Sequence, residues 1–399
     1  MSSHFHSFFL CIAILLFAAC NTESHDPASE SSDEIPMQPT NSYDITGMQL
    51  DSIIHGFIEK GAFPGASIAI GKGLETSVME GYGAYTYTSE RQITPESIFD
   101  LASLTKVIAT TAASMLLYEQ GKLRLDAPVS TYLPEFDTPS RRSITIGHLL
   151  SHASGLPSWR PMHLNGMTTH DALMDSIMTI PLTARPDEVF QYSSYGMIVL
   201  AKVVEMVTQE PFDQWCATHI FETLSMMSTG FHGIGTPDST IVPTEIDTQF
   251  RHRLIQGEVH DENAWIMGGV AGHAGLFSNV EDLSIFAKMM AMRGQLNGTQ
   301  FLQPETIDLF TTAVDTSLGT RALGWDTRGP AHQPSSAGQY FGPRSFGHTG
   351  FTGTSIWIDP ETQIWVILLT NRVHPTRNNY DAFRGVRGLV ADIAYQVFL

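Results

Sequence analysis

The sequence predicts an α+β fold in which strands from both chain ends form one sheet and the middle of the chain forms a mostly helical lobe. Strand-like runs lie within residues 66–87 and 355–370, whereas most segments between about residues 125 and 335 have helical spacing or are rich in Gly and Pro. Elements distributed in this way bury their apolar faces when the two ends share a sheet. We therefore expect an active site between the sheet and the lobe.

The first elements are predicted from the spacing of apolar residues. In Met48–Lys60 they recur at helical intervals, which predicts a helix. Ala66–Ile70 and Thr76–Tyr87 are β-rich runs and predict two strands. Leu101–Glu119 again has helical spacing and is followed closely by a glycine, a residue that commonly ends helices. We expect one helix there that starts near Ser103.

The later elements follow from the same patterns. Helical spacing in Ile198–Val207 and Val280–Arg293 predicts two helices in the middle of the chain. Ser355–Ile358 and Ile364–Thr370 are β-rich runs separated by a turn-forming Asp-Pro-Glu, which predicts two strands. Asp381–Leu399 is expected to close the chain as a helix.

Composition limits the classes of protein to which the chain can belong. A chain of 399 residues that is 42% hydrophobic can build a sizeable core. With 41 acidic against 22 basic residues the formal charge is -19, so DNA or RNA would be repelled over most of the surface. The 3 cysteines have neither the spacing of a zinc site nor that of a disulfide framework. The sequence implies no nucleic-acid partner, no cofactor, no metal and no obligate protein partner.

The N-terminal residues have the features of an export signal. Phe8–Ala19 is wholly apolar, too short to span a bilayer but of the usual length for a signal-peptide core. It ends at Ala18-Ala19-Cys20, which resembles a bacterial lipobox, whose cysteine is lipidated. We predict a signal peptide over residues 1–19, an acidic flexible tether over 20–42 and a folded domain over 43–399. Plain secretion and an uncleaved anchor are alternatives, and all three imply export; lipidation would attach the protein to a membrane of the bacterial cell envelope.

One short motif brings a nucleophile and a base together. In Ser103-Leu104-Thr105-Lys106 a hydroxyl and an amine stand three residues apart at a predicted helix start, where side chains at this spacing share a face. The helix N-terminus favours negative charge on the serine oxygen, and a desolvated lysine can accept a proton. The pattern alone is weak, because an ordinary helix surface produces it as well.

Two further motifs strengthen this interpretation by their order. Tyr192-Ser193-Ser194 and His348-Thr349-Gly350 follow the first motif in the order Ser-x-x-Lys, polar triplet, Lys-Thr-Gly, which is the signature of serine β-lactamases and penicillin-binding proteins. The chain resembles the class C-like branch of that superfamily, in which the triplet is Tyr-x-Asn and His-Thr-Gly is a known variant. The resemblance implies a β-lactamase/transpeptidase-like fold, with an antiparallel sheet built from both chain ends, flanking helices and a helical lobe.

Longer segments extend the resemblance at intervals over Phe63–Arg372. Ile144–Pro157 (ITIGHLLSHASGLP) and Glu119–Phe136 are similar to segments that the superfamily shares. Gly257–Ser278 and Phe346–Pro360 are similar to a subgroup that includes cell-wall-recycling amidases and carboxypeptidase-like penicillin-binding proteins. Members of that subgroup act on peptidoglycan fragments more than on antibiotics.

The resemblance implies a catalytic role for each matched residue. Ser103 would be the acylated nucleophile, and Lys106 the base or its activating partner. Tyr192 would relay the proton to the leaving group. The backbone N–H groups of Ser103 and Phe351 would form the oxyanion hole.

The third motif would form the strand side of the cleft, and two positions depart from the family pattern. His348 and Thr349 would line that side, and Gly350 would let the strand pass close to the substrate. Ser194 stands where relatives have Asn, so a shorter hydroxyl must orient the substrate or assist deacylation. His348 replaces Lys, which removes a permanent charge and makes recognition of a substrate carboxylate pH-dependent.

Other polar residues have structural as well as functional interpretations. Arg372 could hold a substrate carboxylate as a bidentate fork, and a structural salt bridge is an equal alternative. For His260, Asp261 and His273, hydrogen bonds that fix a Gly-rich loop are expected over a metal site. Structural roles are also expected for His148, His152, Cys216, Met289, Met290 and Met292.

The sequence favours an exported serine hydrolase that works through an acyl-enzyme on amide bonds of peptidoglycan-derived peptides, as a carboxypeptidase or a muropeptide amidase. A carboxylesterase of the same superfamily is the main alternative, because the same Ser, Lys and Tyr can hydrolyse esters and His348 relaxes the demand for an anionic substrate. A β-lactamase and a non-catalytic penicillin-fold binding module are further alternatives. The intact Ser103, Lys106 and Tyr192 argue against the non-catalytic module.

Overall fold

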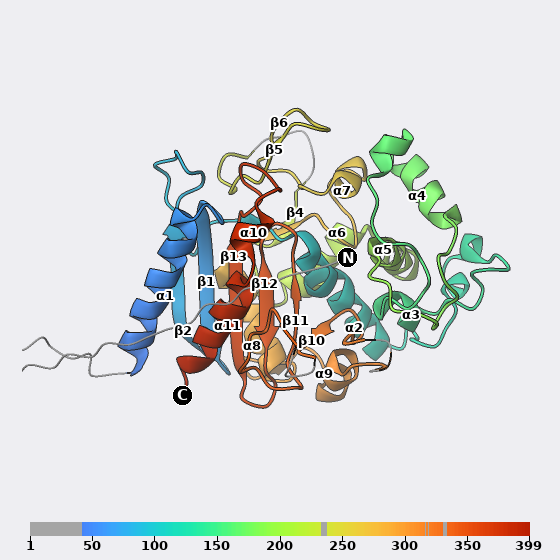
Figure 1. The fold of residues 1–399 in the computed structure, drawn as a ribbon. Helices are drawn as coiled ribbons and strands as arrows, with labels where there is room; N and C mark the ends of the chain where they lie inside the picture. Colours follow the sequence, from blue (N-terminus) through green and yellow to red (C-terminus); the bar gives the residue numbers. More distant parts are fainter. Residues whose placement is uncertain (1–41, 233–237, 316, 318, 330–332) are drawn as a thin grey trace, which may run out of the picture. The chain divides into compact units, whose positions relative to one another are not determined.

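The main sheet is antiparallel and joins the two ends of the chain. The computed structural model describes residues 42–232, 238–315, 317, 319–329 and 333–399. Within them the sheet has six strands in the spatial order β10 (Asp326–Thr327), β11 (Phe346–Thr349), β12 (Ser355–Ile358), β13 (Ile364–Thr370), β1 (Gly65–Lys72) and β2 (Glu75–Gly83) (Figure 1). Because β1 pairs directly with β13, the expected sheet built from both chain ends is confirmed.

The central strands are covered on both faces. The run Ile-Trp-Val-Ile-Leu-Leu-Thr of β13 is wholly buried, which is typical of a strand with helices on both sides. Because side chains alternate along a strand, Leu368 packs in one cluster with α1 (Ser42–Glu59) and α11 (Val386–Gln396), whereas Ile367 belongs to the cluster that contains α8 (Val280–Ala291). In Figure 1, α1 and α11 accordingly lie on one face of the sheet and α8 on the other.

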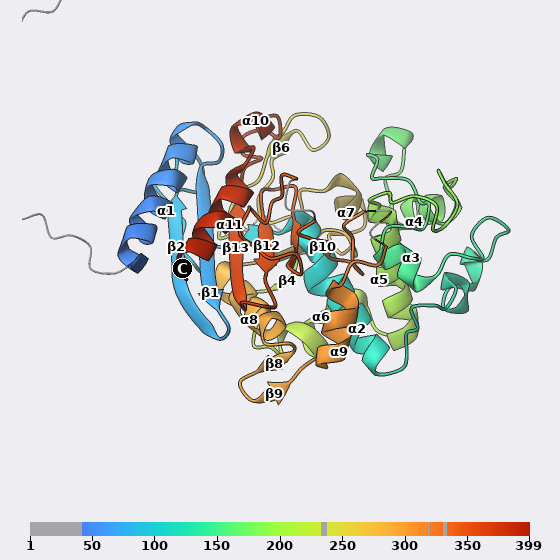
Figure 2. The ribbon, with the colours of Figure 1, turned by 60° about the horizontal axis from the view of Figure 1, so that its bottom comes forward.

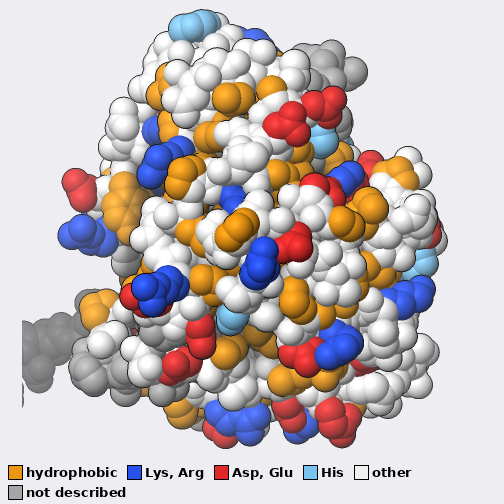
Figure 3. Space-filling view, turned by 90° about the vertical axis from the view of Figure 1, so that its right-hand side faces the viewer, with side chains coloured by type: hydrophobic (Ala, Val, Ile, Leu, Met, Phe, Trp, Pro, Cys, Tyr) orange, Lys and Arg blue, Asp and Glu red, His pale blue; other side chains and the backbone are white. Residues whose placement is uncertain are grey.

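The remaining helices lie beside the sheet (Figure 2). The most apolar of them, α5, is buried along most of its length and forms the centre of this part of the molecule. On the face drawn in Figure 3, acidic and basic side chains are interspersed with apolar ones. The helices are α2 (Ala112–Glu119), α3 (Ile146–Leu150), α4 (His170–Thr179), α5 (Ser194–Thr208), α6 (Phe212–Cys216), α7 (Glu262–Ile266) and α9 (Pro304–Thr311).

Three predicted elements differ from the structure for local reasons. The helix expected over Leu101–Glu119 begins as a 3₁₀ turn and continues as a π-helical stretch before it becomes α2. The expected C-terminal helix is two helices, α10 (Tyr380–Phe383) and α11, because Gly385 has φ +84° and a right-handed helix cannot continue through it. The second strand ends at Gly83, at φ +68°, and not at Tyr87.

Short strands complete the fold and were not predicted. The two pairs are β5 (Ile246–Asp247) with β6 (Arg253–Leu254), and β8 (Gln295–Leu296) with β9 (Thr299–Gln300). A three-stranded sheet is formed by β3 (Phe99–Asp100), β7 (Leu276–Ser278) and β4 (Gly230–Phe231). This small sheet matters for function, because β3 leads directly into the serine motif.

The predicted signal peptide, the tether and the lipidation site at Cys20 lie outside the described residues, apart from Ser42, with which α1 begins. Within the part of the chain that is described, no helix is both long and apolar enough to cross a membrane.

Candidate active site

Ser103 lies in a sharp turn between β3 and the following helix. The preceding residue, Ala102, has φ +47°, a strained conformation for a residue with a side chain. The Asp100 carboxylate supports the turn, because its Oδ1 accepts a hydrogen bond from the Ala102 N–H at 2.8 Å. The local fold thus holds the serine at a fixed place at the start of the helix.

Lys106 is in contact with the serine hydroxyl, as the sequence motif predicts. Its Nζ donates to Ser103 Oγ at 2.9 Å and to the carbonyl oxygen of His273 at 3.0 Å. Lys106 is 0% exposed, so bulk water does not compete for its amine. In its neutral form an amine at this distance can accept the serine proton.

Tyr192, for which the resemblance implies proton transfer, lies beside Lys106. The centroid of its ring lies 5.1 Å from Lys106 Nζ and 4.6 Å from the centroid of the His152 ring. His152 also binds the neighbouring backbone, since its Nδ1 accepts a hydrogen bond from the Ser193 N–H at 3.3 Å. The histidine expected to be structural therefore packs directly against a candidate catalytic residue. His148 has a more distant role, in the capping box of α3.

The third motif lies against the serine turn. A Cβ at Gly350 would come within 2.4 Å of the Leu101 carbonyl oxygen and 2.1 Å of Thr354 Oγ1, so a glycine is required at this close approach. Thr354 Oγ1 donates to the same carbonyl at 2.9 Å. The turn between β11 and β12 is thereby fixed to the backbone that carries the nucleophile.

A cavity of about 220 Å³ joins these groups. On the catalytic side it is lined by Ser103, Tyr192 and Ser194, and Phe351 lines it from the turn after β11. Ser103 and Phe351 border one cavity, as an oxyanion hole formed by their N–H groups requires. The structure therefore brings together the first, second and third motifs, although they are far apart in the sequence.

His348 departs from the expected role. It is only 2% exposed, and its Nδ1–H donates to the Thr349 carbonyl at 2.8 Å. Burial lowers the pKa of His348 well below its ordinary value, and the nearby positive charges of Arg321 and Lys106 lower it further. The imidazole is therefore neutral at physiological pH. This burial argues against charging of His348 in the ordinary histidine range. Its role toward a substrate carboxylate stays a prediction.

Arg372 lies behind the residues that line the cavity. Its guanidinium is buried and packs on the ring of Phe351, with 4.7 Å between the guanidinium carbon and the ring centroid. It is not among the described residues that line the cavity. Burial lowers the pKa of Arg372. The side chain supports Phe351, and Arg372 forms no salt bridge with any described residue. Its role toward a substrate carboxylate stays a prediction.

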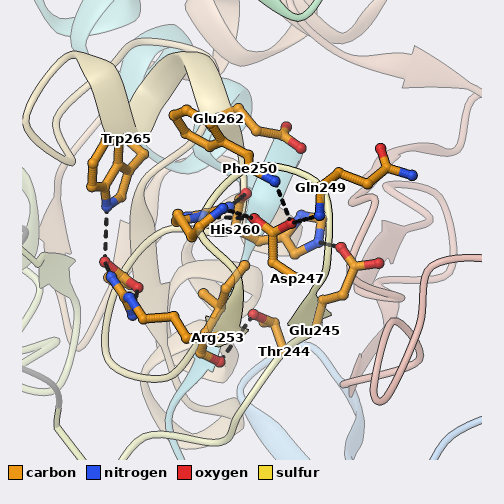
Figure 4. A network of polar contacts seen from close by, with 12 residues as sticks. Thr244, Glu245, Asp247, Gln249, Phe250, Arg253, His260, Glu262 and Trp265 are labelled. Carbon is orange, nitrogen blue, oxygen red and sulfur yellow. Dashed lines mark hydrogen bonds and ion pairs between the residues drawn. The ribbon is translucent and has the colours of Figure 1, made fainter. Parts of the chain in front are cut away.

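The other half of the cavity is formed by residues to which the sequence assigned no substrate role. They are Trp159, His260, Asp261, Glu262 and Arg377. His260 and Asp261 were expected only to fix a loop, and each does so through a contact at 3.0 Å. His260 Nε2 contacts Glu245 Oε2 (Figure 4), and Asp261 Oδ1 contacts His273 Nε2. The segment Gly257–Ser278 resembles a subgroup of the superfamily. That resemblance is the one sequence signal that could have identified its charged residues as candidates for substrate binding.

Comparisons with known proteins agree with this geometry. The chain matches the beta-lactamase family over residues 50–390. It is 33% identical to a putative D-alanyl-D-alanine carboxypeptidase of Escherichia coli K12 over 307 residues, which cover 70% of each chain. It is also 33% identical to an N-acetylmuramyl-L-alanine amidase of Bacillus subtilis over 358 residues, which cover 82% of this chain and 81% of the amidase.

Solved structures show the same fold. EstCE1, a hydrolase with promiscuous acyltransferase activity, superposes with a TM-score of 0.72 at 24% identity and covers 90% of this chain and 100% of its own. An octameric penicillin-binding protein homologue from Pyrococcus abyssi has a TM-score of 0.67 at 24% identity, covering 86% of this chain and 77% of its own.

Proposed function

The chain belongs to the beta-lactamase family, and from this premise we propose that it is an exported acyl-enzyme hydrolase of amide bonds in peptidoglycan-derived peptides. That it is an enzyme of the serine-hydrolase type follows from the family and from relatives named carboxypeptidase and amidase. The proposed substrate is supported by those two names, since both activities cleave amide bonds of cell-wall peptides. The observation that carries the mechanism is the 2.9 Å contact between Lys106 Nζ and Ser103 Oγ at the active-site cavity.

The proposed reaction has two steps. Ser103 Oγ attacks the amide carbon while its proton passes to Lys106, and the N–H groups of Ser103 and Phe351 stabilise the oxyanion. Tyr192 then delivers a proton to the departing amine as the C–N bond breaks, which leaves an ester on Ser103. The proton on Lys106 then passes to Tyr192, which restores both groups. A water molecule gives a proton to Lys106 and attacks the ester, and this proton moves to Ser103 Oγ as the acyl C–O bond breaks. The products are a free carboxylate and the regenerated serine.

One experiment separates this proposal from its alternatives. The protein is incubated with a muropeptide panel, a penicillin, a simple p-nitrophenyl ester and a fluorophosphonate, and intact-mass spectra and products are recorded. We expect fluorophosphonate and transient acyl adducts on Ser103 and cleavage of a muropeptide amide. Turnover of the ester alone would replace the proposal by a carboxylesterase, turnover of penicillin by a β-lactamase, and no adduct at all by a binding module.

The carboxylesterase keeps its place as second candidate because of His348. A neutral, buried imidazole at the strand side supplies no permanent charge for a substrate carboxylate. Neutral esters, which have no carboxylate to be recognised, would therefore bind in this site without losing an interaction.

We also propose that the protein is a lipoprotein anchored through Cys20, on the resemblance of Ala18-Ala19-Cys20 to a lipobox. Wild-type protein should then partition with membranes, and Cys20→Ser should move it to the soluble or secreted fraction. Cys11→Ser, which changes a cysteine within the apolar stretch, is the matched control and should not change the fractionation. Identical fractionation of wild type and Cys20→Ser would refute the anchor.

A further inference from the structure

The cavity that contains Ser103 also contains a carboxylate paired with a guanidinium. Glu262, the first residue of α7, is 6% exposed and lines this cavity together with Arg377. Arg377 Nη2 donates to Glu262 Oε1 at 2.9 Å. The two residues come from segments more than a hundred positions apart, so the fold has assembled this pair at the site.

Arg377 is already neutralised by a different carboxylate, Glu245. The guanidinium contacts Glu245 Oε2 through Nε at 2.7 Å and Nη2 at 2.6 Å, and the backbone N–H of Arg377 donates to Oε1 at 3.0 Å. Burial alone would raise the pKa of Glu245, but hydrogen bonds from His260 and Arg377 lower it to about 2. Glu245 is therefore ionised and balances the charge of Arg377.

Glu262 keeps one carboxylate oxygen, Oε2, free for a further donor, because its contact with Arg377 uses Oε1. No described residue donates a hydrogen bond to its Oε2, and Arg377 is shared with Glu245. Figure 4 shows the carboxylate of Glu262 among the neighbouring polar residues. The adjacent Asp261 is paired with His273 and lies in the field of Lys106, so it is compensated separately. A nearly buried carboxylate with one free oxygen in a cavity is a strong acceptor for a charged donor.

We propose that Glu262 binds a primary ammonium group of the substrate and so selects peptides that carry a free amine near the scissile amide. The side-chain amine of a diamino acid and a free peptide N-terminus both belong to this class. Trp159, which lines the same cavity, adds an aromatic surface that favours a cation. The choice of peptides as the substrate class rests on the proposed function, whereas the preference for an ammonium group rests on the cavity alone.

The position of Glu262 relative to the nucleophile is fixed by one shared carboxylate. Asp100 accepts the Ala102 N–H on Oδ1 and the His260 N–H on Oδ2, at 2.8 and 2.7 Å. The turn that presents Ser103 and the segment that leads into Glu262 are therefore bonded to the same side chain. A substrate ammonium held by Glu262 would place its amide at a defined distance from Ser103.

Two matched substrate pairs test the proposal. One pair is a muropeptide whose diamino acid has a free or an N-acetylated side-chain amine. The other is p-nitrophenyl 6-aminohexanoate and its isosteric neutral analogue, p-nitrophenyl heptanoate. For wild type we expect kcat/KM to be roughly tenfold higher for the ammonium member, mainly through KM, as a hydrogen bond between charged groups gives. Glu262→Gln, which can still accept from Arg377, should bring the ratio close to one.

Glu90→Gln is the control for a general change in charge, since Glu90 is exposed on a loop after β2 and the variant should keep the wild-type ratio. Equal rates for the charged and neutral members of both pairs in wild type would overturn the proposal, even if Glu262→Gln did not fold. So would a folded Glu262→Gln that kept the ratio. A higher kcat/KM for the ammonium ester than for the neutral ester, without cleavage of any peptide, would refute the proposed function. It would still support the role of Glu262.

Discussion

Ser103→Ala should lower kcat/KM for every substrate by about 10⁴-fold or more, because the acyl-enzyme requires the serine oxygen. Removal of the hydroxyl leaves Lys106 with the His273 carbonyl as its remaining partner, so the fold should be retained. The measurement is steady-state hydrolysis of an ester and a muropeptide, together with fluorophosphonate labelling followed by intact mass. Labelling should be absent in the variant.

Ser140→Ala, a change at an exposed loop serine, is the matched control and should keep the wild-type rate. Circular dichroism and a thermal unfolding curve establish that Ser103→Ala is folded. A folded variant that retains more than a few per cent of wild-type turnover would exclude Ser103 as the nucleophile. The mechanism built on the contact between Ser103 and Lys106 would then be wrong.

The sequence predicted the long helices and strands well, but it predicted neither the short strands nor the type of helix that follows Ser103. The apolar run of β13 and the spacing of α8 reveal their type because many residues share one period. The two-residue strand β3 has no period to detect, although it sets the direction of the serine turn. The π-helical stretch Lys106–Thr111 has apolar spacing that an α-helix would also have, so sequence alone could not separate the two.

Site residues were predicted where chemistry is carried by a local motif. Ser103 and Lys106 are three positions apart, and their contact follows from helical geometry. Glu262 and Arg377 come together only through the folded chain, so no spacing could have paired them. Arg372 and Arg377 both follow β13, but of the two only Arg377 lines the cavity. The path of the loop after β13 determines this difference, and the sequence does not reveal that path.

Two buried histidines should make the protein sensitive to mild acid. His152 and His348 are both enclosed, and burial is the largest cause that lowers the pKa of each well below its ordinary value. The positive charges of Arg321 and Lys106 lower both pKa values further. Each ring has one nitrogen in a hydrogen bond, and Nε2 of each is buried without a partner among the described residues. Both imidazoles are thus held in the neutral form.

The sign of the effect follows from proton binding. In the unfolded chain a histidine titrates near pH 6.5, whereas in the folded protein these two titrate lower, so below pH 6.5 the unfolded chain binds more protons. Stability is therefore complete above about pH 6.5 and is lost as pH falls toward the lowered folded pKa values. Glu245, with a folded pKa of about 2, acts only at more acid pH. Burial raises the pKa of Asp100, so protonation of that group opposes the loss at the acid end of the range.

The free energy of unfolding should accordingly fall by about 2 kcal/mol between pH 6.5 and 5.5, since each buried histidine contributes up to about 1.4 kcal/mol per pH unit. Urea unfolding curves at the two pH values measure this change, and ¹⁵N spectra of the imidazoles should show both rings neutral at pH 5.5. Spectra of the urea-unfolded chain are the control, since histidines in an unfolded chain titrate near pH 6.5. Equal stability at pH 6.5 and 5.5, or a charged His348 at pH 5.5, would contradict the enclosure of these rings and restore His348 as a pH-dependent group in the active site.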